Sequence, residues 1–135
     1  MISDKAYIAP GAKLGKNVTV YPFVYIEDDV VIGDDCVIYP YVSIMKGTRL
    51  GRGNKVFQNT VLGAEPQDFN YKGDDTRLII GDENIFRENV VINRATFADG
   101  ETRIGNRNFF MEGVHISHDT KVGDYVTFGY GTKVA

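Results

Sequence analysis

The sequence predicts an all-β fold, a parallel β-helix in which the chain coils into a triangular prism. Three observations support this prediction: large apolar residues recur every six positions, smaller residues follow them at a constant offset, and glycines recur at three times that interval. An α-helix would require an apolar period near 3.6, and an ordinary strand alternates apolar and polar residues only as far as its turn. A sustained period of six is a hexapeptide repeat, which is typical of a β-solenoid.

The first block of repeats runs without interruption from position 8 to position 62. Its large residues are Ile8, Leu14, Val20, Ile26, Ile32, Ile38, Ile44, Leu50, Val56 and Leu62. The smaller residues, four positions after each step, are Ala12, Val18, Val24, Val30, Cys36, Val42, Thr48, Asn54 and Thr60. We expect the large residues to stack inside the prism, coil upon coil, and the short segment Met1–Ala6 to cap the first coil.

The spacing of the glycines predicts the length of one coil and exposes two insertions. The glycines that follow a large apolar residue along one edge are Gly15, Gly33, Gly51, Gly81, Gly105 and Gly123. The first three lie three repeats apart, so three repeats make one coil. The wider gaps further on indicate an insertion of twelve residues between Leu62 and Ile80 and one of six residues between Ile92 and Ile104.

The second block of repeats resumes in the same phase. Its large residues are Ile80, Phe86, Ile92, Ile104, Phe110, Ile116, Val122, Phe128 and Val134. Asn54, Asn84 and Asn108 are separated by the same widened gaps. We therefore predict an internal asparagine ladder in which each amide bonds to the neighbouring coil.

This register places both insertions at one corner of the prism, and the same corner passes Arg94 and reaches His118. His118 follows the inward-pointing Ile116 by two positions and adjoins Asp119. A histidine beside a carboxylate suits a general base, because the carboxylate fixes the tautomer and stabilises the imidazolium. The alternative is a solvated corner histidine. Two insertions and a histidine at one corner favour a functional site there.

Composition narrows the classes of function. The net charge is −3 and both signs are interspersed, so we expect no nucleic-acid partner. The sequence shows no signal peptide and no membrane span, and the single Cys36 occupies a small interior position, so we predict a cytoplasmic protein. With two histidines in the whole chain, we expect no metal site and no cofactor.

Several short motifs resemble one family, the acyl-ACP–UDP-N-acetylglucosamine O-acyltransferases that begin lipid A biosynthesis. The matching stretches are Gly63–Tyr71, Gly73–Arg77, Ile85–Asn89, Asn93–Thr96 and His115–Asp119, and the likeness runs from Met1 to the last residue. Hexapeptide repeats alone are weak evidence, whereas Pro66–Phe69 together with the two-histidine motif is specific. The resemblance implies a left-handed helix, against the usual right-handed crossover, and a homotrimer with active sites between neighbouring prisms.

The resemblance also implies roles for individual residues. His118 would be the general base that takes the proton from the glucosamine 3-hydroxyl of UDP-N-acetylglucosamine, as that oxygen attacks the β-hydroxyacyl thioester on acyl carrier protein. Asp119 would support His118. His115 and Met111 would line the site, and Gln67 and Asp68 would reach the nucleotide sugar. Without the resemblance, Gln67 and Asp68 would be interpreted as an ordinary polar loop.

Arg94 is the remaining candidate substrate-binding residue, and its role stays open. It lies one coil from His118 and could attract phosphates or the acidic carrier protein, or it could pair with a nearby carboxylate. The surface cations Lys46, Arg49, Arg52 and Lys55 could serve the same carrier, although charges on a solenoid are usually just solvated.

We interpret residues 1–135 as a single β-helix domain that ends partway through a coil, without the further coils and helical C-terminal domain that the resemblance implies. Such a truncated chain is expected to have little or no activity. One alternative is a truncated or engineered scaffold that self-associates through its open last coil. Another, a metal enzyme of the γ-carbonic anhydrase type, would need three histidines across an interface, and only His115 and His118 are present.

Overall fold

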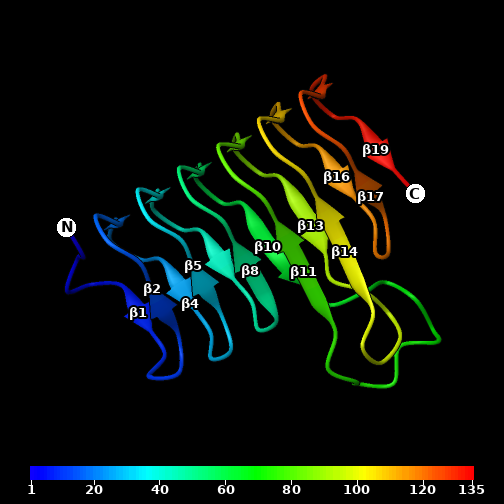
Figure 1. The fold of residues 1–135 in the computed structure, drawn as a ribbon, viewed down its shortest axis with the longest axis horizontal. Helices are drawn as coiled ribbons and strands as arrows, with labels where there is room; N and C mark the ends of the chain where they lie inside the picture. The colour runs from blue at the N-terminus through cyan, green and yellow to red at the C-terminus, as the bar shows by residue number, and fades with distance from the viewer.

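A computed structural model describes residues 1–135 as a parallel β-helix of short strands, as the repeats predict, and the helix is left-handed, as the resemblance implies (Figure 1). The strands form three parallel sheets, and each turn of the chain contributes one strand to each sheet. The first sheet holds β1 (Tyr7–Ile8), β4 (Tyr25–Ile26), β7 (Ser43–Ile44), β10 (Val61–Ala64), β13 (Val91–Asn93), β16 (His115–Ile116) and β19 (Lys133–Val134). The second holds β2 (Lys13–Leu14), β5 (Val31–Ile32), β8 (Thr48–Leu50), β11 (Arg77–Ile80), β14 (Glu101–Ile104) and β17 (Lys121–Val122). The third holds β3 (Thr19–Val20), β6 (Val37–Ile38), β9 (Lys55–Val56), β12 (Ile85–Phe86), β15 (Phe109–Phe110) and β18 (Thr127–Phe128).

The register of the second sheet confirms the coil length and both insertions. Ile32 pairs with Leu50, Leu50 pairs with Ile80, and Ile80 pairs with Ile104. The large apolar residues therefore meet one another in a column although the spacing between them in sequence changes. From Val20 to Ile116 they are buried and form one core, in which the rings of Phe86 and Phe110 stack with centroids 4.7 Å apart. Stacking of identical positions on successive coils is what makes a six-residue period sufficient to specify the fold.

The predicted asparagine ladder is present and completely buried. The side-chain oxygen of Asn54 accepts the backbone N–H of Asn84 at 2.8 Å and its side-chain amide at 3.1 Å. The side-chain oxygen of Asn84 accepts the backbone N–H of Asn108 at 2.9 Å. Each amide nitrogen donates to a glycine carbonyl of the coil beyond it, for example Asn84 to Gly105 at 2.9 Å. The ladder thus links side chain to backbone as well as amide to amide.

The two ends of the chain extend the same pattern. Ile2 forms an isolated parallel bridge with Val20, and the backbone N–H of Ser3 donates to the Val20 carbonyl at 2.9 Å. Residues before β1 therefore add to the third sheet, as a cap on the first coil would. At the other end, β19 is the first strand of a seventh coil. No helix of the structure is long and apolar enough to cross a membrane.

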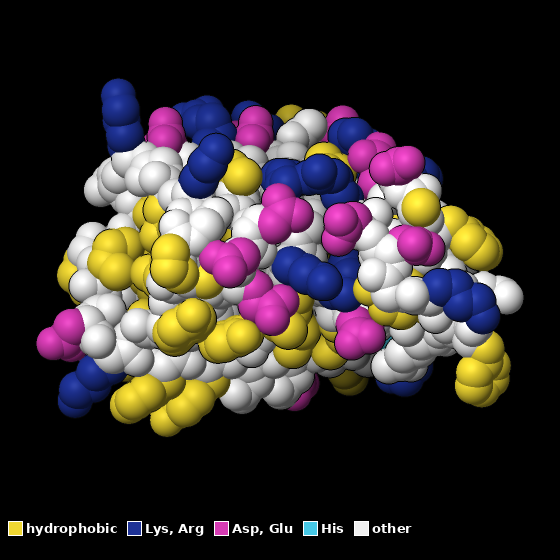
Figure 2. All heavy atoms as spheres, turned by 90° about the horizontal axis from the view of Figure 1, so that it is seen from below, with side chains coloured by type: hydrophobic (Ala, Val, Ile, Leu, Met, Phe, Trp, Pro, Cys, Tyr) yellow, Lys and Arg dark blue, Asp and Glu magenta, His cyan; other side chains and the backbone are white.

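Charged side chains of both signs are interspersed over the middle of the face seen from below, and hydrophobic side chains gather toward the N-terminal coils (Figure 2). The exposed aromatic residues of these coils stack across the turns: Tyr7 on Tyr25 at 5.4 Å, and Phe23 on Tyr41 at 5.5 Å. The first coils therefore present stacked aromatic rings to solvent.

Candidate active site

Three segments meet at the corner between the first and second sheets. The first excursion, residues 65–76, joins β10 to β11; the second, residues 94–100, joins β13 to β14; and residues 117–120 join β16 to β17. Both excursions leave the prism on the same side, as the repeats predict (Figure 1). Because successive coils stack in register, side chains on these three connections lie above one another along the corner.

His118 lies at the centre of this corner, between two carboxylates and a hydroxyl group. Its Nδ1 atom is 2.8 Å from Oδ2 of Asp119 and 2.9 Å from Oγ1 of Thr96. Its Nε2 atom is 3.9 Å from Oδ2 of Asp68, on the first excursion. The structure thus brings together three predicted site residues, His118, Asp119 and Asp68, together with one that was not predicted.

Asp119 is ionised at neutral pH and determines which ring nitrogen carries the proton. Burial raises the pKa of the Asp119 carboxyl, but hydrogen bonds from His118 and Thr96 outweigh it and hold the pKa below the ordinary value. An ionised carboxylate can only accept, so the Nδ1 atom of His118 must be the donor. The neutral imidazole then keeps a lone pair on Nε2, the atom a general base needs.

Two threonines hold the segment that carries this pair. The backbone N–H of Thr96 faces both oxygens of Asp119, at 3.3 and 3.4 Å. The hydroxyl oxygen of Thr102 accepts the backbone N–H of Asp119 at 2.8 Å. Both threonines are fully buried. Asp119 itself adopts a left-handed backbone conformation with φ of 66°, which short polar residues tolerate better than others.

Arg94 is buried beneath the first excursion and not on the surface. Its guanidinium group donates to the carbonyl of Gly63 at 2.7 Å and to the hydroxyl of Tyr71 at 2.9 Å. Neither acceptor is a carboxylate. The pairing with a nearby carboxylate, one of the roles that the sequence left open, is therefore not observed. Arg94 anchors the loop that carries Asp68; a contact with substrate stays a prediction.

The other predicted site residues lie further from His118. Gln67 is exposed on the first excursion, next to Asp68. His115 is half-buried on β16, and burial, the charge of Lys133 and the neighbouring His118 lower its pKa, in that order of size. Met111 lies at the opposite end of β16 from His118, because it precedes this strand and His118 follows it.

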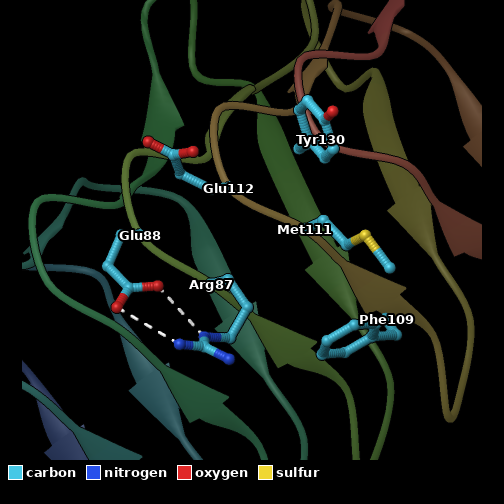
Figure 3. Close-up of a pocket in the computed structure, with 6 residues that line it drawn as sticks. All are labelled: Arg87, Glu88, Phe109, Met111, Glu112 and Tyr130. Atoms are coloured by element: carbon cyan, nitrogen blue, oxygen red, sulfur yellow. Dashed lines mark hydrogen bonds and ion pairs between the residues drawn. The ribbon is translucent and has the colours of Figure 1, made fainter.

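Met111 lines a hollow of its own, with a volume of about 440 Å³ (Figure 3). The other residues that line it are Arg87, Glu88, Phe109, Glu112 and Tyr130. Arg87 and Glu88 form an ion pair at 3.0 Å, and the hydrogen bond from Arg87 lowers the pKa of Glu88. His118, Asp68 and Thr96 do not line this hollow, so one copy of the chain does not bring Met111 and His118 into one pocket.

Thr96 is the residue that sequence reasoning missed. It belongs to the Asn93–Thr96 motif and lies inside the second insertion, so a motif and a gap both indicated the segment. The repeat pattern does not specify how an inserted residue points, and a single threonine has no distinctive spacing. Its contact with His118 depends on the path of the excursion across the coil above.

The residues at this corner do not form a metal centre of the common kind. No group of three or more histidine, cysteine, aspartate or glutamate side chains is arranged to hold a metal ion. His115 and His118 lie on one short segment, and the site's polar groups already bond to one another.

The repeats, the sheet order and the corner site can be compared with known proteins. The family model for bacterial transferase hexapeptide proteins, which describes six repeats, matches residues 29–64 and 101–135. The chain belongs to this family. Its resemblance to the acyl-ACP–UDP-N-acetylglucosamine O-acyltransferases is also confirmed, because curated relatives of this hexapeptide protein carry that name.

One such relative, from Saccharophagus degradans, is 44% identical over 125 residues, which cover 92% of this chain and 48% of the relative. Another, from Bartonella henselae, is 45% identical over 128 residues, with 94% of this chain and 47% of the relative covered. A solved UDP-N-acetylglucosamine acyltransferase from Bacteroides fragilis superposes with a TM-score of 0.98 at 50% identity, over 100% of this chain and 53% of that one. The hexapeptide chain therefore spans about half the length of the relatives it matches.

Proposed function

We propose that this chain carries the general-base half of an acyltransferase site that moves a β-hydroxyacyl group from acyl carrier protein to the 3-hydroxyl of UDP-N-acetylglucosamine. The observation that carries the proposal is the pairing of His118 Nδ1 with Asp119 Oδ2 at 2.8 Å, which leaves Nε2 available as a base. The names of the relatives supply the substrates. The proposed setting is the cytoplasm.

In the proposed reaction, Nε2 of His118 takes the proton of the sugar 3-hydroxyl. The oxygen then forms a bond to the thioester carbonyl carbon of the acyl donor. When the tetrahedral intermediate collapses, the carbon–sulfur bond breaks and the leaving sulfur receives the proton from the imidazolium. Asp119 stabilises the imidazolium from the Nδ1 side throughout. Asp68 and Gln67 are proposed to bind the sugar, since carboxylate and amide groups can both bond hydroxyls.

The positions of Met111 and His118 support a site shared between neighbouring copies. These two residues lie on either side of β16 and do not line one hollow of the single chain. In a closed ring of identical chains, one surface patch of each copy packs on a different patch of its neighbour. We therefore propose a homotrimer in which Met111 of one copy approaches the His118 corner of the next.

The test of the reaction is transfer of hydroxyacyl groups of several chain lengths from acyl carrier protein to UDP-N-acetylglucosamine. We expect any turnover of this chain to fall by at least about 10²-fold in His118→Ala, since a positioned base contributes about 10²–10⁴-fold. Lys13→Ala, on a surface strand far along the second sheet, is the matched control. Measurable turnover that is equal in this chain and in His118→Ala would refute His118 as the base.

Sedimentation equilibrium tests the assembly separately. A mass of three chains that is constant over a tenfold range of concentration supports the trimer. A mass that keeps rising with concentration would support instead the scaffold that pairs through its last coil, and a single-chain mass would contradict both.

A further inference from the structure

Thr96 contacts three polar side chains of the candidate site at once. Its hydroxyl oxygen is 2.9 Å from Nδ1 of His118 and 3.5 Å from Oδ2 of Asp68. Its backbone N–H faces the carboxylate of Asp119. One residue of the second excursion thus contacts the base, the carboxylate behind the base, and the carboxylate on the other excursion.

The direction of each hydrogen bond follows from the donors available. Asp119 and Asp68 offer acceptors when ionised, and the imidazole carries one proton, on Nδ1. The Nδ1–H group is therefore shared between Asp119 and the Thr96 oxygen. Because this oxygen accepts from the ring, the hydroxyl proton of Thr96 is free to point at Asp68.

The surroundings of His118 explain why a second partner matters. Asp119 is itself more exposed than His118, with 41% of its side chain accessible against 25%, whereas Thr96 is fully buried. A bond to a partly solvated carboxylate holds the ring less firmly, because water competes for the same oxygen atoms. A second bond, to a buried hydroxyl on a β-branched side chain with restricted χ1, fixes the ring plane.

We propose that Thr96 is a positioning residue that fixes the ring plane of His118, with Nδ1 directed at Asp119, and couples the ring to Asp68. The proposal rests on the assignment of His118 as the general base. In this proposal the second excursion supplies the hydroxyl group that positions His118. Substitution of Thr96 therefore disturbs the base although Thr96 itself does not contact substrate. Serine should serve in its place, and valine, which has the same shape without the hydroxyl, should not.

The test is NMR of the imidazole of His118 in this chain, above the pH at which the ring is charged. In the unmodified chain we expect the Nδ1–H tautomer, a low-field Nδ1 proton protected from exchange, and a nuclear Overhauser effect from that proton to the Thr96 methyl group. Thr96→Ser should keep the protected proton. Thr96→Val should lose this protection, because the ring is then held by the partly exposed Asp119 alone.

Thr60→Val is the matched control, because Thr60 is an equally buried threonine whose hydroxyl donates to a backbone carbonyl, that of Arg87, at 2.7 Å. It should lose stability without changing the His118 signals. The proposal is overturned if Thr96→Val keeps the protected proton, or if Thr96→Ser loses it. It is also overturned, whether or not the variants fold, if the unmodified chain shows no contact between the Nδ1 proton and Thr96. None of these readouts requires turnover, so they separate this proposal from failure of the proposed reaction.

Discussion

The two excursions leave the prism at the same corner, but they are built differently. Within residues 65–76, only Asn70 and Tyr71 donate backbone N–H groups to protein acceptors, and both donate to Asp68 of the same loop. The second excursion bonds to its surroundings: Arg94 donates a backbone N–H to Ala64, Ala95 to Arg77 and Asp99 to Asp75. Its side chains Arg94, Ala95 and Thr96 are buried, whereas Phe69 of the first excursion is fully exposed.

This difference indicates a division of roles. The second excursion is part of the packed structure, and it supports both the base and the first excursion through Thr96 and Arg94. The first excursion carries Gln67 and Asp68 over the site while making few bonds of its own. Precise positioning of a base requires buried, fully bonded supports, whereas a loop that admits a substrate must open at low cost.

Hydrogen exchange should show the largest difference between the two excursions. We expect amides of residues 67–75 to exchange through local openings that cost far less free energy than global unfolding. Those of Arg94 and Ala95 should approach the global stability, usually about 5–15 kcal/mol. The measurement is native-state exchange followed by NMR or mass spectrometry. Similar protection in both excursions would mean that the first also packs tightly, for example against a neighbouring copy.

Asn84→Leu should have the next largest effect and tests the coils that carry both excursions. The substitution leaves the backbone N–H of Asn108 and the carbonyl of Gly105 without their side-chain partners, inside the prism. Each stranded buried group costs about 1–3 kcal/mol. For the two groups together, urea unfolding should show a loss of about 2–6 kcal/mol. Asn70→Leu, at an exposed position, should change stability by less than about 0.5 kcal/mol. An unaltered midpoint for Asn84→Leu would argue against the ladder as a stabilising element.

Arg94→Met should have a smaller effect that falls mainly on the first excursion. It removes the hydrogen bonds to Gly63 and Tyr71, but also a buried charge whose Nε atom has no partner. The lost bonds and the relieved desolvation oppose each other, so we expect a net loss of about 1–2 kcal/mol. Exchange in residues 67–75 should accelerate, and Arg52→Met, at an exposed arginine, should leave it unchanged. No acceleration would show that Arg94 does not anchor this loop.

These contrasts also explain what the sequence could predict. Every coil repeats the same period, and this period determines the coil length, both insertion lengths and the Asn54–Asn84–Asn108 column. A wrong register would misplace apolar residues in many coils at once, so the correct register can be recognised. The excursions have no period. Their corner could be predicted from the register of Ile80 and Ile104, but the burial of Arg94 and the contact of Thr96 with His118 depend on irregular backbone paths. The repeat register and the adjacent carboxylate therefore indicated His118 and Asp119, the motif resemblance agreed, and only the structure found Thr96.

Lys133→Met should produce the smallest effect, in the coil beyond both excursions. His115 pairs in register with Lys133, and its pKa is lowered first by burial and then by this charge. The variant should therefore raise the pKa of His115 toward the ordinary value of about 6.5 without reaching it. An NMR titration of the ring protons measures this directly, and Lys121→Met, on a different sheet, is the control.

The same shift has a consequence for stability with a definite sign. The folded chain disfavours protonated His115, so the contribution of this residue is fully present above the unfolded pKa of about 6.5 and is lost as the pH falls through the folded value. Urea midpoints should thus decline below about pH 6.5, and Lys133→Met should make that decline shallower. An identical decline in both chains would mean that burial and His118 set the protonation of His115 without a contribution from the charge of Lys133 on β19.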